Sequence, residues 1–190
     1  MKKKVGLALG AGSAKGFAHI GVLQALEEAG IGIDMISGSS MGAIIGGIYS
    51  VGTDLAMLER FITSIKLYDY LDVKLPLNGG LLKGERLQDL IRVLTHNKTF
   101  AETKIPFCCV VVDAETGKLD VLEEGPLHES IRASMSMPAF FEPVPLNGKI
   151  YIDGGVLERV PCKTLRDHGM DVVIGVDVGY HGDIKDVSDF

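Results

Sequence analysis

Four stretches of the chain are apolar almost without interruption, and each is short enough to be one β-strand. They are residues 5–9, 33–36, 106–113 and 171–178. A strand that is apolar on both faces must be covered on both faces, which is typical of parallel sheets. Segments with the helical spacing of apolar residues separate these strands, so the sequence predicts an α/β protein with a mainly parallel central sheet.

The predicted helices begin and end where capping residues, glycine or proline favour it. They span residues 17–29, 43–51, 84–95, 127–136 and 161–168, with one more helix following Thr53 and Asp54. Further strands are expected over residues 118–122 and 149–152, and an irregular stretch over 66–83. No repeat or linker divides the chain. We therefore expect one domain over residues 1–179 and a polar tail over 180–190.

Composition narrows the class of protein. The formal net charge of −6 argues against nucleic acid as a partner, because nucleic-acid binding favours a basic face. The chain has three cysteines, and the adjacent Cys108 and Cys109 lie in an apolar run, which indicates buried thiols and not a disulfide framework. Residues 1–10 are better explained as a first strand than as a signal peptide. These features predict a reduced, cytoplasmic setting.

The pattern Gly38-x-Ser40-x-Gly42 lies between a predicted strand and a predicted helix. A nucleophilic serine needs a tight turn, and small residues on either side let the strand and the helix pass closely. The dipole of the following helix would favour negative charge developing near Ser40. The alternative is a glycine-rich turn that only packs tightly.

A second glycine-rich loop, residues 10–16, also follows a strand and precedes a helix, so its amides could face an anion. A dinucleotide site, a phosphate-binding loop, an oxyanion hole and a purely structural turn are the alternatives. The G-x-G-x-x-G and Gly-Lys-Ser/Thr patterns are both absent. Of the three ligand-binding alternatives, only the oxyanion hole also explains Ser40. Lys15 could neutralise a phosphate or cap the loop.

A third pattern, Asp153-Gly154-Gly155, follows the strand over residues 149–152. By itself an Asp-Gly pair is most often a plain turn. Next to Ser40, however, Asp153 is a candidate base. His168 and His181 come later in the chain, which gives the Ser, Asp, His order of an α/β-hydrolase triad as the alternative mechanism. His19 is expected to be a structural histidine.

Taken together, these patterns resemble the patatin-like phospholipase family in its small bacterial form. The resemblance extends over nearly the whole chain and rests on five segments: residues 6–16 (GLALGAGSAKG), 18–23 (AHIGVL), 38–46 (GSSMGAIIG), 132–138 (RASMSMP) and 151–155 (YIDGG). It implies a three-layer α/β/α sandwich and a lipid acyl-ester hydrolase, of the phospholipase A or lysophospholipase type, that needs no metal and no cofactor.

The resemblance also implies roles for individual residues. Ser40 matches the nucleophile and Asp153 the general base of a dyad without histidine. The oxyanion loop matches Gly10, Ala11, Gly12 and Ser13, and the supporting motif positions are Lys15, Gly16, Gly38, Gly42, Gly154 and Gly155. The chain departs from the family pattern where Ala11 and Ser13 replace glycines, and where Glu158 and Arg159 replace an asparagine before Pro161.

An aspartate with the ordinary pKa of about 3.9 is a weak base towards serine, so Asp153 is expected to be buried. An apolar but broken stretch over residues 67–82 could be an acyl-binding or membrane-facing flap, or an ordinary loop over the core. Expected partners are a lipid or other acyl-ester substrate and, through peripheral contact, a membrane. The competing functions are a non-catalytic adaptor and a nucleotide-binding protein.

Overall fold

The computed structural model describes residues 3–64 and 80–179 of the chain. Within these residues, seven strands form one sheet in the order β7-β8-β4-β2-β1-β9, with β5 paired to β4. Their bounds are β1 Val5–Leu9, β2 Met35–Gly38, β4 Phe107–Asp113, β5 Leu119–Leu122, β7 Val144–Leu146, β8 Lys149–Asp153 and β9 Val172–Val176. β3 (Gly80–Leu82) and β6 (Ala139–Phe141) form a separate parallel pair.

The large sheet is mixed. β9, β1, β2 and β4 run parallel, whereas β5, β8 and β7 join through antiparallel pairings. The predicted, mainly parallel sheet is therefore parallel over the apolar strands. Residues 106–122 form the strand, turn and strand expected there, whereas the antiparallel direction of β8 and β7 was not foreseen. Short connections account for two of these pairings, β4 with β5 and β7 with β8, because only antiparallel strands can be joined by a tight hairpin. Asn147 and Gly148, both at positive φ, make such a turn between β7 and β8.

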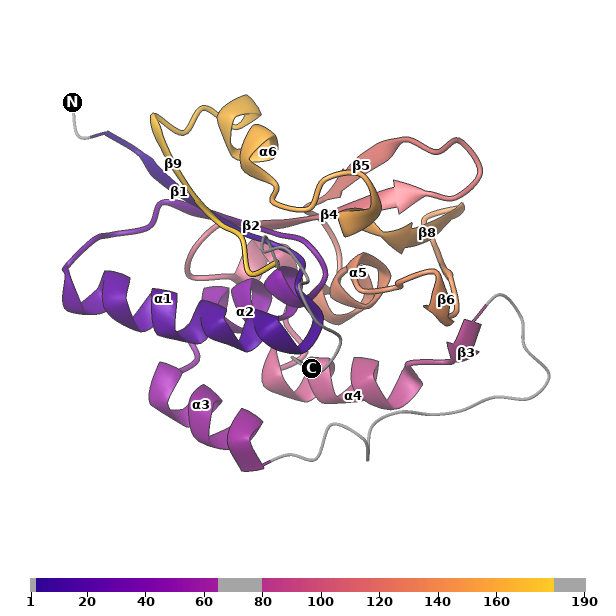
Figure 1. Cartoon of the computed structure of the whole chain (residues 1–190), viewed down its shortest axis with the longest axis horizontal. Coiled ribbons are helices and arrows are strands. Elements are labelled where there is room, and N and C mark those ends of the chain that lie inside the picture. The colour runs from indigo at the N-terminus through magenta and orange to yellow at the C-terminus, as the bar shows by residue number, and fades with distance from the viewer. Residues whose placement is uncertain (1–2, 65–79, 180–190) are drawn as a thin grey trace, which may run out of the picture.

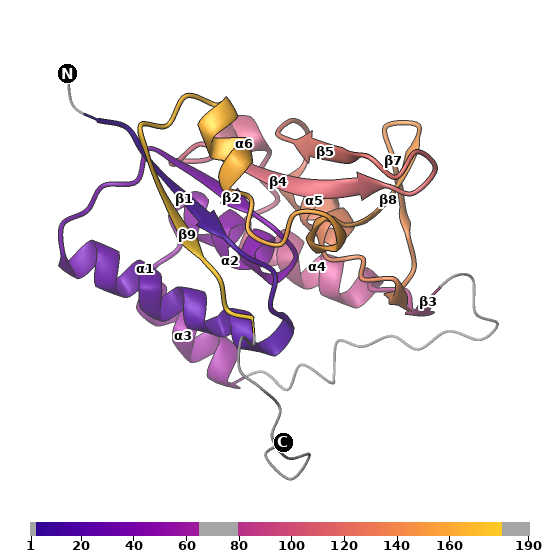
Figure 2. The same cartoon turned by 45° about the horizontal axis from the view of Figure 1, so that its top comes forward.

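Helices cover both faces of the sheet, which confirms the three-layer α/β/α sandwich (Figures 1 and 2). On one face, Leu7, Leu9 and Ile36 pack into the larger core cluster with α2 and its neighbours. On the other face, Ala8 and Cys108 pack against Leu165 of α6. The helices are α1 Ala18–Glu28, α2 Met41–Ser50, α3 Leu55–Ser64, α4 Glu85–Leu94, α5 Leu127–Ser134 and α6 Cys162–Asp167.

The predicted helices and strands all occur, with ends displaced by a few residues. A 3-10 turn, η1 (Ser13–Phe17), precedes α1. Three strands were missed: β6 and β7, and β3 inside the stretch expected to be irregular. The remainder of the predicted flap, residues 65–79, and the predicted polar tail, residues 180–190, lie outside the described residues. Arg132 of α5 explains β3 in part, since it donates to the carbonyl groups of Lys83 and Glu142 beyond β3 and β6.

Cys108 and Cys109 are free thiols with no exposed surface, as predicted. Burial raises the pKa of Cys108 to about 12 and that of Cys109 well above its ordinary value. A neutral thiol is a poor nucleophile. Both residues are therefore part of the core. Among residues 3–64 and 80–179, no helix has the length and apolar character needed to cross a bilayer.

Candidate active site

Ser40 lies at a strained turn between β2 and α2. Its φ of 53° and ψ of −118° fall outside the regions that non-glycine residues favour. The flanking glycines allow this turn by close approach. A Cβ atom on Gly42 would lie 2.0 Å from the carbonyl oxygen of Leu9, and one on Gly38 would lie 2.5 Å from Cα of Ala43. The strand and the helix can meet this closely only without side chains at both positions.

Ser134, on α5, holds the strained turn from behind. Its hydroxyl oxygen accepts a hydrogen bond from the Ser40 amide at 3.1 Å and donates to the Val110 carbonyl oxygen at 2.8 Å. The side chain is fully buried. One hydroxyl thus ties the backbone of Ser40 to the central strand β4. Ser134 was not predicted as a site residue, although it lies in the motif at residues 132–138.

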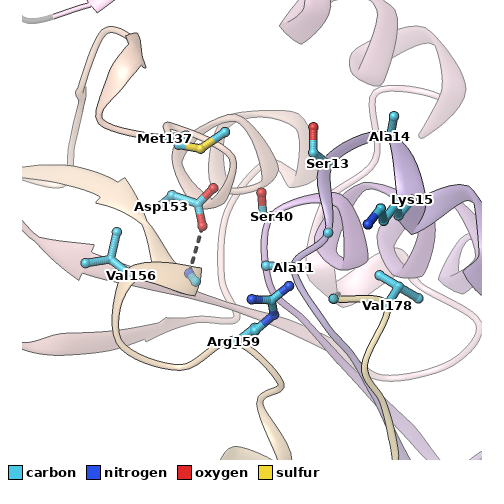
Figure 3. Close-up of a pocket in the computed structure, with 13 residues that line it drawn as sticks. Ala11, Ser13, Ala14, Lys15, Ser40, Met137, Asp153, Val156, Arg159 and Val178 are labelled. Carbon is cyan, nitrogen blue, oxygen red and sulfur yellow. Dashed lines mark hydrogen bonds between the residues drawn. The ribbon is translucent and has the colours of Figure 1, made fainter. Parts of the chain in front are cut away.

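Asp153 ends strand β8 and is only 4% exposed. Its amide donates to the Ser136 carbonyl oxygen at 3.0 Å, and its Oδ1 accepts from the Gly155 amide at 2.7 Å (Figure 3). Gly154 must be glycine, because a Cβ atom there would lie 2.2 Å from the Val110 carbonyl oxygen. The Asp-Gly-Gly turn therefore presses against the middle of β4.

The pairing along β4 brings Ser40 and Asp153 together. Gly38 of β2 lies opposite Cys109, and Asp153 of β8 lies opposite Val111. Because β5 occupies the other edge of β4, β2 and β8 must share this edge. β2 runs parallel to β4 and β8 antiparallel, so their ends converge near Val110. Figure 3 shows the Ser40 hydroxyl beside the Asp153 carboxylate.

Burial raises the pKa of Asp153 above its ordinary value of 3.8. Hydrogen bonding with the Ser40 side chain and with the Gly155 amide opposes part of this effect, since both favour the ionised form. The expected burial of Asp153 is confirmed. A carboxylate with a raised pKa is a stronger base than one in water.

The glycine-rich loop divides into two parts. The amides of Gly10 and Ala11 already donate to the carbonyl oxygens of Val176 and Arg159, at 3.0 and 2.8 Å. Within the described part of the chain, the amides of Gly12 and Ser13 donate to no backbone oxygen. Ser13 has a φ of 49°, so the strain expected for a residue replacing glycine falls on Ser13.

His19 supports this loop from the core. It has no exposed surface, and its Nε2 lies 2.8 Å from the Gly10 carbonyl oxygen, which can only accept. Nε2 therefore carries the proton. Burial lowers the pKa of His19, so the ring is held neutral. This is the structural role predicted from the sequence.

A cavity of about 650 Å³ opens over Ser40 and Asp153. The glycine-rich loop supplies part of the lining, with Ser13 and Lys15, and Gly155 lines the cavity as well. Gly155 lies against the loop, since a Cβ atom there would come within 2.8 Å of the Ala11 side chain. The other residues that line it were not foreseen as site residues: Ala14, Met137, Val156, Arg159, Val178 and Gly179. Gly16 lies beneath the loop, where a Cβ atom would come within 2.1 Å of the Met41 side chain.

The histidine alternative fails for His168. Its Nδ1 lies 2.7 Å from the Thr164 carbonyl oxygen and its Nε2 lies 2.8 Å from Glu123. Both ring nitrogens are thus engaged away from the cavity, which His168 does not line. His181 lies outside the described residues. Over residues 3–64 and 80–179, no three His, Cys, Asp or Glu side chains gather as metal ligands would.

The comparison with family models decides the class. Residues 7–166 match the model described as patatin-like phospholipase. The chain belongs to the patatin-like phospholipase family. The match contains both glycine-rich loops, Ser40 and Asp153, which confirms the family resemblance seen in the sequence.

Related sequences of this patatin-like chain come from bacteria and animals. An uncharacterized NTE family protein of Mycobacterium bovis is 35% identical over 177 residues, which cover 92% of this chain and 49% of that protein. Human patatin-like phospholipase domain-containing protein 6 is 31% identical over 92% of this chain, but only 13% of the human protein is covered. The chain thus spans half or less of these relatives.

Solved structures share the patatin-like fold. VipD from Legionella pneumophila matches with a TM-score of 0.70 at 16% identity, covering 84% of this chain and 47% of VipD. The type III effector protein ExoU matches with a TM-score of 0.56 at 18% identity, covering 70% of this chain and 40% of ExoU. At these identities, the matches establish the fold of the patatin-like chain.

Proposed function

We propose that this protein hydrolyses lipid acyl esters with Ser40 as nucleophile and Asp153 as general base. One observation carries the proposal: a serine on a strained strand-to-helix turn faces a buried carboxylate within one cavity. An acyl-transfer serine needs this exposure and this adjacent base. Membership of the patatin-like phospholipase family supports the same chemistry.

In the proposed first step, Asp153 takes the proton from the Ser40 hydroxyl while the hydroxyl oxygen attacks the ester carbonyl. The negative charge then moves to the carbonyl oxygen. The amides of Gly12 and Ser13 are the proposed donors to that oxyanion, because those of Gly10 and Ala11 are already bonded. The dipole at the start of α2 favours the same charge.

Collapse of this intermediate breaks the ester bond, and Asp153 returns the proton to the departing alcohol oxygen. The acyl group remains on Ser40. In the second half, Asp153 removes a proton from water, the hydroxide oxygen attacks the acyl carbonyl, and Ser40 leaves with the proton. One water is consumed, and one alcohol and one carboxylic acid are released. No other group is needed to move protons.

We further propose that residues 1–179 act as one cytoplasmic patatin-like domain that meets its lipid substrate at a membrane surface. Exposed apolar side chains lie near the cavity and support peripheral contact. Met137 and Val156 line it, and Phe140 and Leu157 lie close to them in the chain, each 38–56% exposed. Exposed apolar groups next to a binding site are typical of interaction surfaces.

A fluorophosphonate probe followed by peptide mapping tests the dyad. We expect Ser40 to be labelled in the unmodified protein, and labelling to fall by about 10³-fold in Asp153→Asn. Asp167→Asn is the matched control, because Asp167 is an exposed aspartate paired with Lys163. A folded protein whose Ser40 resists the probe and that hydrolyses no lipid ester would instead be a non-catalytic adaptor on this fold.

A further inference from the structure

His19 is a buried ionisable side chain that the proposed reaction steps do not use. It lies in the first turn of α1, has no exposed surface and does not line the cavity. Its Nε2 donates to the Gly10 carbonyl oxygen at 2.8 Å, whereas its Nδ1 has no hydrogen-bond partner among the described residues. A buried nitrogen without a partner costs free energy that an apolar side chain would avoid. The hydrogen bond from Nε2 must therefore be what this histidine provides.

This hydrogen bond holds one end of a peptide plane whose other end is also held. The Gly10 carbonyl and the Ala11 amide belong to the same peptide unit, which is planar. The carbonyl oxygen accepts from His19, and the amide donates to the Arg159 carbonyl oxygen at 2.8 Å. The plane therefore cannot rotate without breaking a hydrogen bond. The next peptide unit carries the Gly12 amide, so only the two dihedral angles of Ala11 separate that amide from the fixed plane.

The Gly10 carbonyl also lies against the turn that carries the nucleophile. A Cβ atom on Gly42 would lie 2.8 Å from the Gly10 carbonyl oxygen, which places this oxygen between His19 and the first turn of α2. The ring packs at the far end of the same loop as well, because its Cδ2 lies 3.7 Å from the position of a Cβ atom on Gly16. His19 thus contacts both ends of the glycine-rich loop, and through Gly10 it sets the loop against the Ser40 turn.

The part of the loop between these two contacts needs such support. Ser13 has a φ of 49°, a conformation that persists in a non-glycine residue only where the surroundings hold it. Within residues 3–64 and 80–179, the amides of Gly12 and Ser13 donate to no backbone oxygen, so no such bond fixes their direction. An oxyanion gains most from donors that already point at it before the reaction begins. The direction of these two amides must therefore come from how the loop is attached.

We infer that His19 is a positioning residue, which holds the amides of Gly12 and Ser13 in the direction required by the oxyanion formed at Ser40. It acts through the Gly10 carbonyl and touches neither the substrate nor the reacting atoms. The unpaired Nδ1 is the consequence of placing a rigid donor at Nε2. The role in catalysis rests on the proposed hydrolase function, whereas the attachment of the loop is a property of the folded chain.

Two amide variants separate the Nε2 donor from the rest of the ring. In His19→Gln the side-chain NH2 group can take the place of Nε2, whereas the shorter side chain of His19→Asn cannot reach Gly10. Backbone 15N relaxation measures the outcome without any substrate. The order parameters of Gly12 and Ser13 should fall from about 0.85 towards about 0.6 in His19→Asn and stay near the parent value in His19→Gln. Equal order parameters in all three proteins would overturn the inference.

The unmodified protein gives a second test, which does not depend on whether a variant folds. The 15N spectrum of the His19 ring should show a neutral imidazole with its proton on Nε2, because the Gly10 carbonyl oxygen can only accept. A ring that carries its proton on Nδ1 alone would overturn the inference.

Turnover then tests the role in catalysis. His19→Asn should lower kcat by about 10²-fold with KM little changed, because a misdirected amide fails only when charge develops on the ester oxygen. His19→Gln should keep most of the activity. Thr95→Ala is the matched control, since Thr95 is equally buried and donates to the Ile91 carbonyl oxygen of α4, away from the cavity. This control should lower stability without lowering kcat.

Failure of the inference and failure of the hydrolase proposal look different. If the parent protein hydrolyses esters and His19→Asn keeps its kcat, the positioning role is overturned and the hydrolase stands. If Ser40 resists the fluorophosphonate probe and no ester is hydrolysed, while the order parameters still respond to His19→Asn, the attachment of the loop is upheld. Its role in catalysis then falls together with the hydrolase.

Discussion

The two halves of the proposed dyad are positioned by different physical means. Ser40 stands where β2 meets α2, and steric contact sets its position: Gly42 touches the Leu9 carbonyl and the backbone has positive φ. Asp153 stands at the end of an antiparallel strand, and the turn after it is packed as closely, since Gly154 lies against the Val110 carbonyl. The Asp153 residue itself, however, is held by hydrogen bonds to Ser136 and Gly155. Excluded volume is far less tolerant of change than a hydrogen bond.

This difference separates the effects of substitution. Changes on the serine side should damage the fold together with the activity, since the strand and the helix cannot move apart alone. Changes confined to the Asp153 side chain should affect chemistry while leaving the fold intact, or even more stable. The two halves can therefore be distinguished by measuring activity and unfolding on the same variants.

The largest effect is expected at Gly42. Its Cβ in Gly42→Ala would lie 2.0 Å from a backbone oxygen, so the helix must shift and the free energy of unfolding should fall by more than about 3 kcal/mol. Activity should be lost with it. Gly21→Ala in α1 is the control, because no atom lies within 4 Å of the added Cβ. Thermal unfolding of both proteins would measure the contrast, and equal stabilities would refute the steric account.

Asp153→Asn should lower kcat by about 10³-fold. The same change should raise the free energy of unfolding by about 1 kcal/mol at neutral pH. The sign follows from the raised pKa of Asp153. The folded protein holds this proton more tightly than the unfolded chain, so the ionised, buried carboxylate destabilises the fold above the folded-state pKa. The gain should shrink as the pH falls through that pKa toward 3.8. A variant less stable than the parent at neutral pH would contradict this.

The pH dependence of kcat/KM provides a separate test of Asp153. Because the ionised form is the base, activity should fall as the pH drops through the raised pKa, at a pH above 3.8. Hydrolysis rates on a soluble ester would locate the pH at which activity falls. Circular dichroism at each pH would check that the protein remains folded. Activity that persists unchanged below pH 4 would exclude Asp153 as a buried general base.

Ser134→Ala tests the hydroxyl that ties the Ser40 backbone to strand β4, against which the Asp153 turn also packs. Losing the acceptor for the Ser40 amide and the bond to Val110 should cost about 1–2 kcal/mol of stability and lower kcat about tenfold, with KM little changed. Ser50→Ala is the matched control, since Ser50 is equally buried but bonds within α2 to Gly47. If both variants lose only stability, Ser134 has no part in positioning Ser40.

The smallest effect is expected at His168. Since its ring nitrogens contact Thr164 and Glu123, His168→Ala should leave activity within about twofold of the parent. Its pKa is raised, first by the Thr164 carbonyl, so its stabilising contribution is present below 6.5 and is lost as the pH rises through the folded-state pKa. The melting temperature should therefore drop slightly at pH 6 but not at pH 8. Loss of activity in His168→Ala would instead support the Ser, Asp, His triad as the mechanism.

Much of the site could be predicted because its signals are local. The glycines around Ser40 and after Asp153 lie within a few residues of the groups they serve, and apolar runs identified the parallel strands. Ser134 and Arg159 were missed as residues of the site for the opposite reason. Their partners, Ser40 and Ala11, lie 94 and 148 positions away in the chain. No short sequence pattern reveals a contact between residues this far apart in the chain.

The sequence by itself determined the α/β class and the serine turn, because these follow from local spacing and apolar character, and its motifs determined the family. The burial of Asp153 was expected only from the basicity that its role requires. Only the tertiary structure decided that β8 runs antiparallel and meets β2 on one edge of β4. The same holds for the loop amides. The amides of Gly10 and Ala11 donate to carbonyl oxygens that are distant in the sequence, whereas those of Gly12 and Ser13 donate to no backbone oxygen of the described residues. Strand pairing and hydrogen-bond partners depend on which distant segments meet, and that is a property of the folded chain.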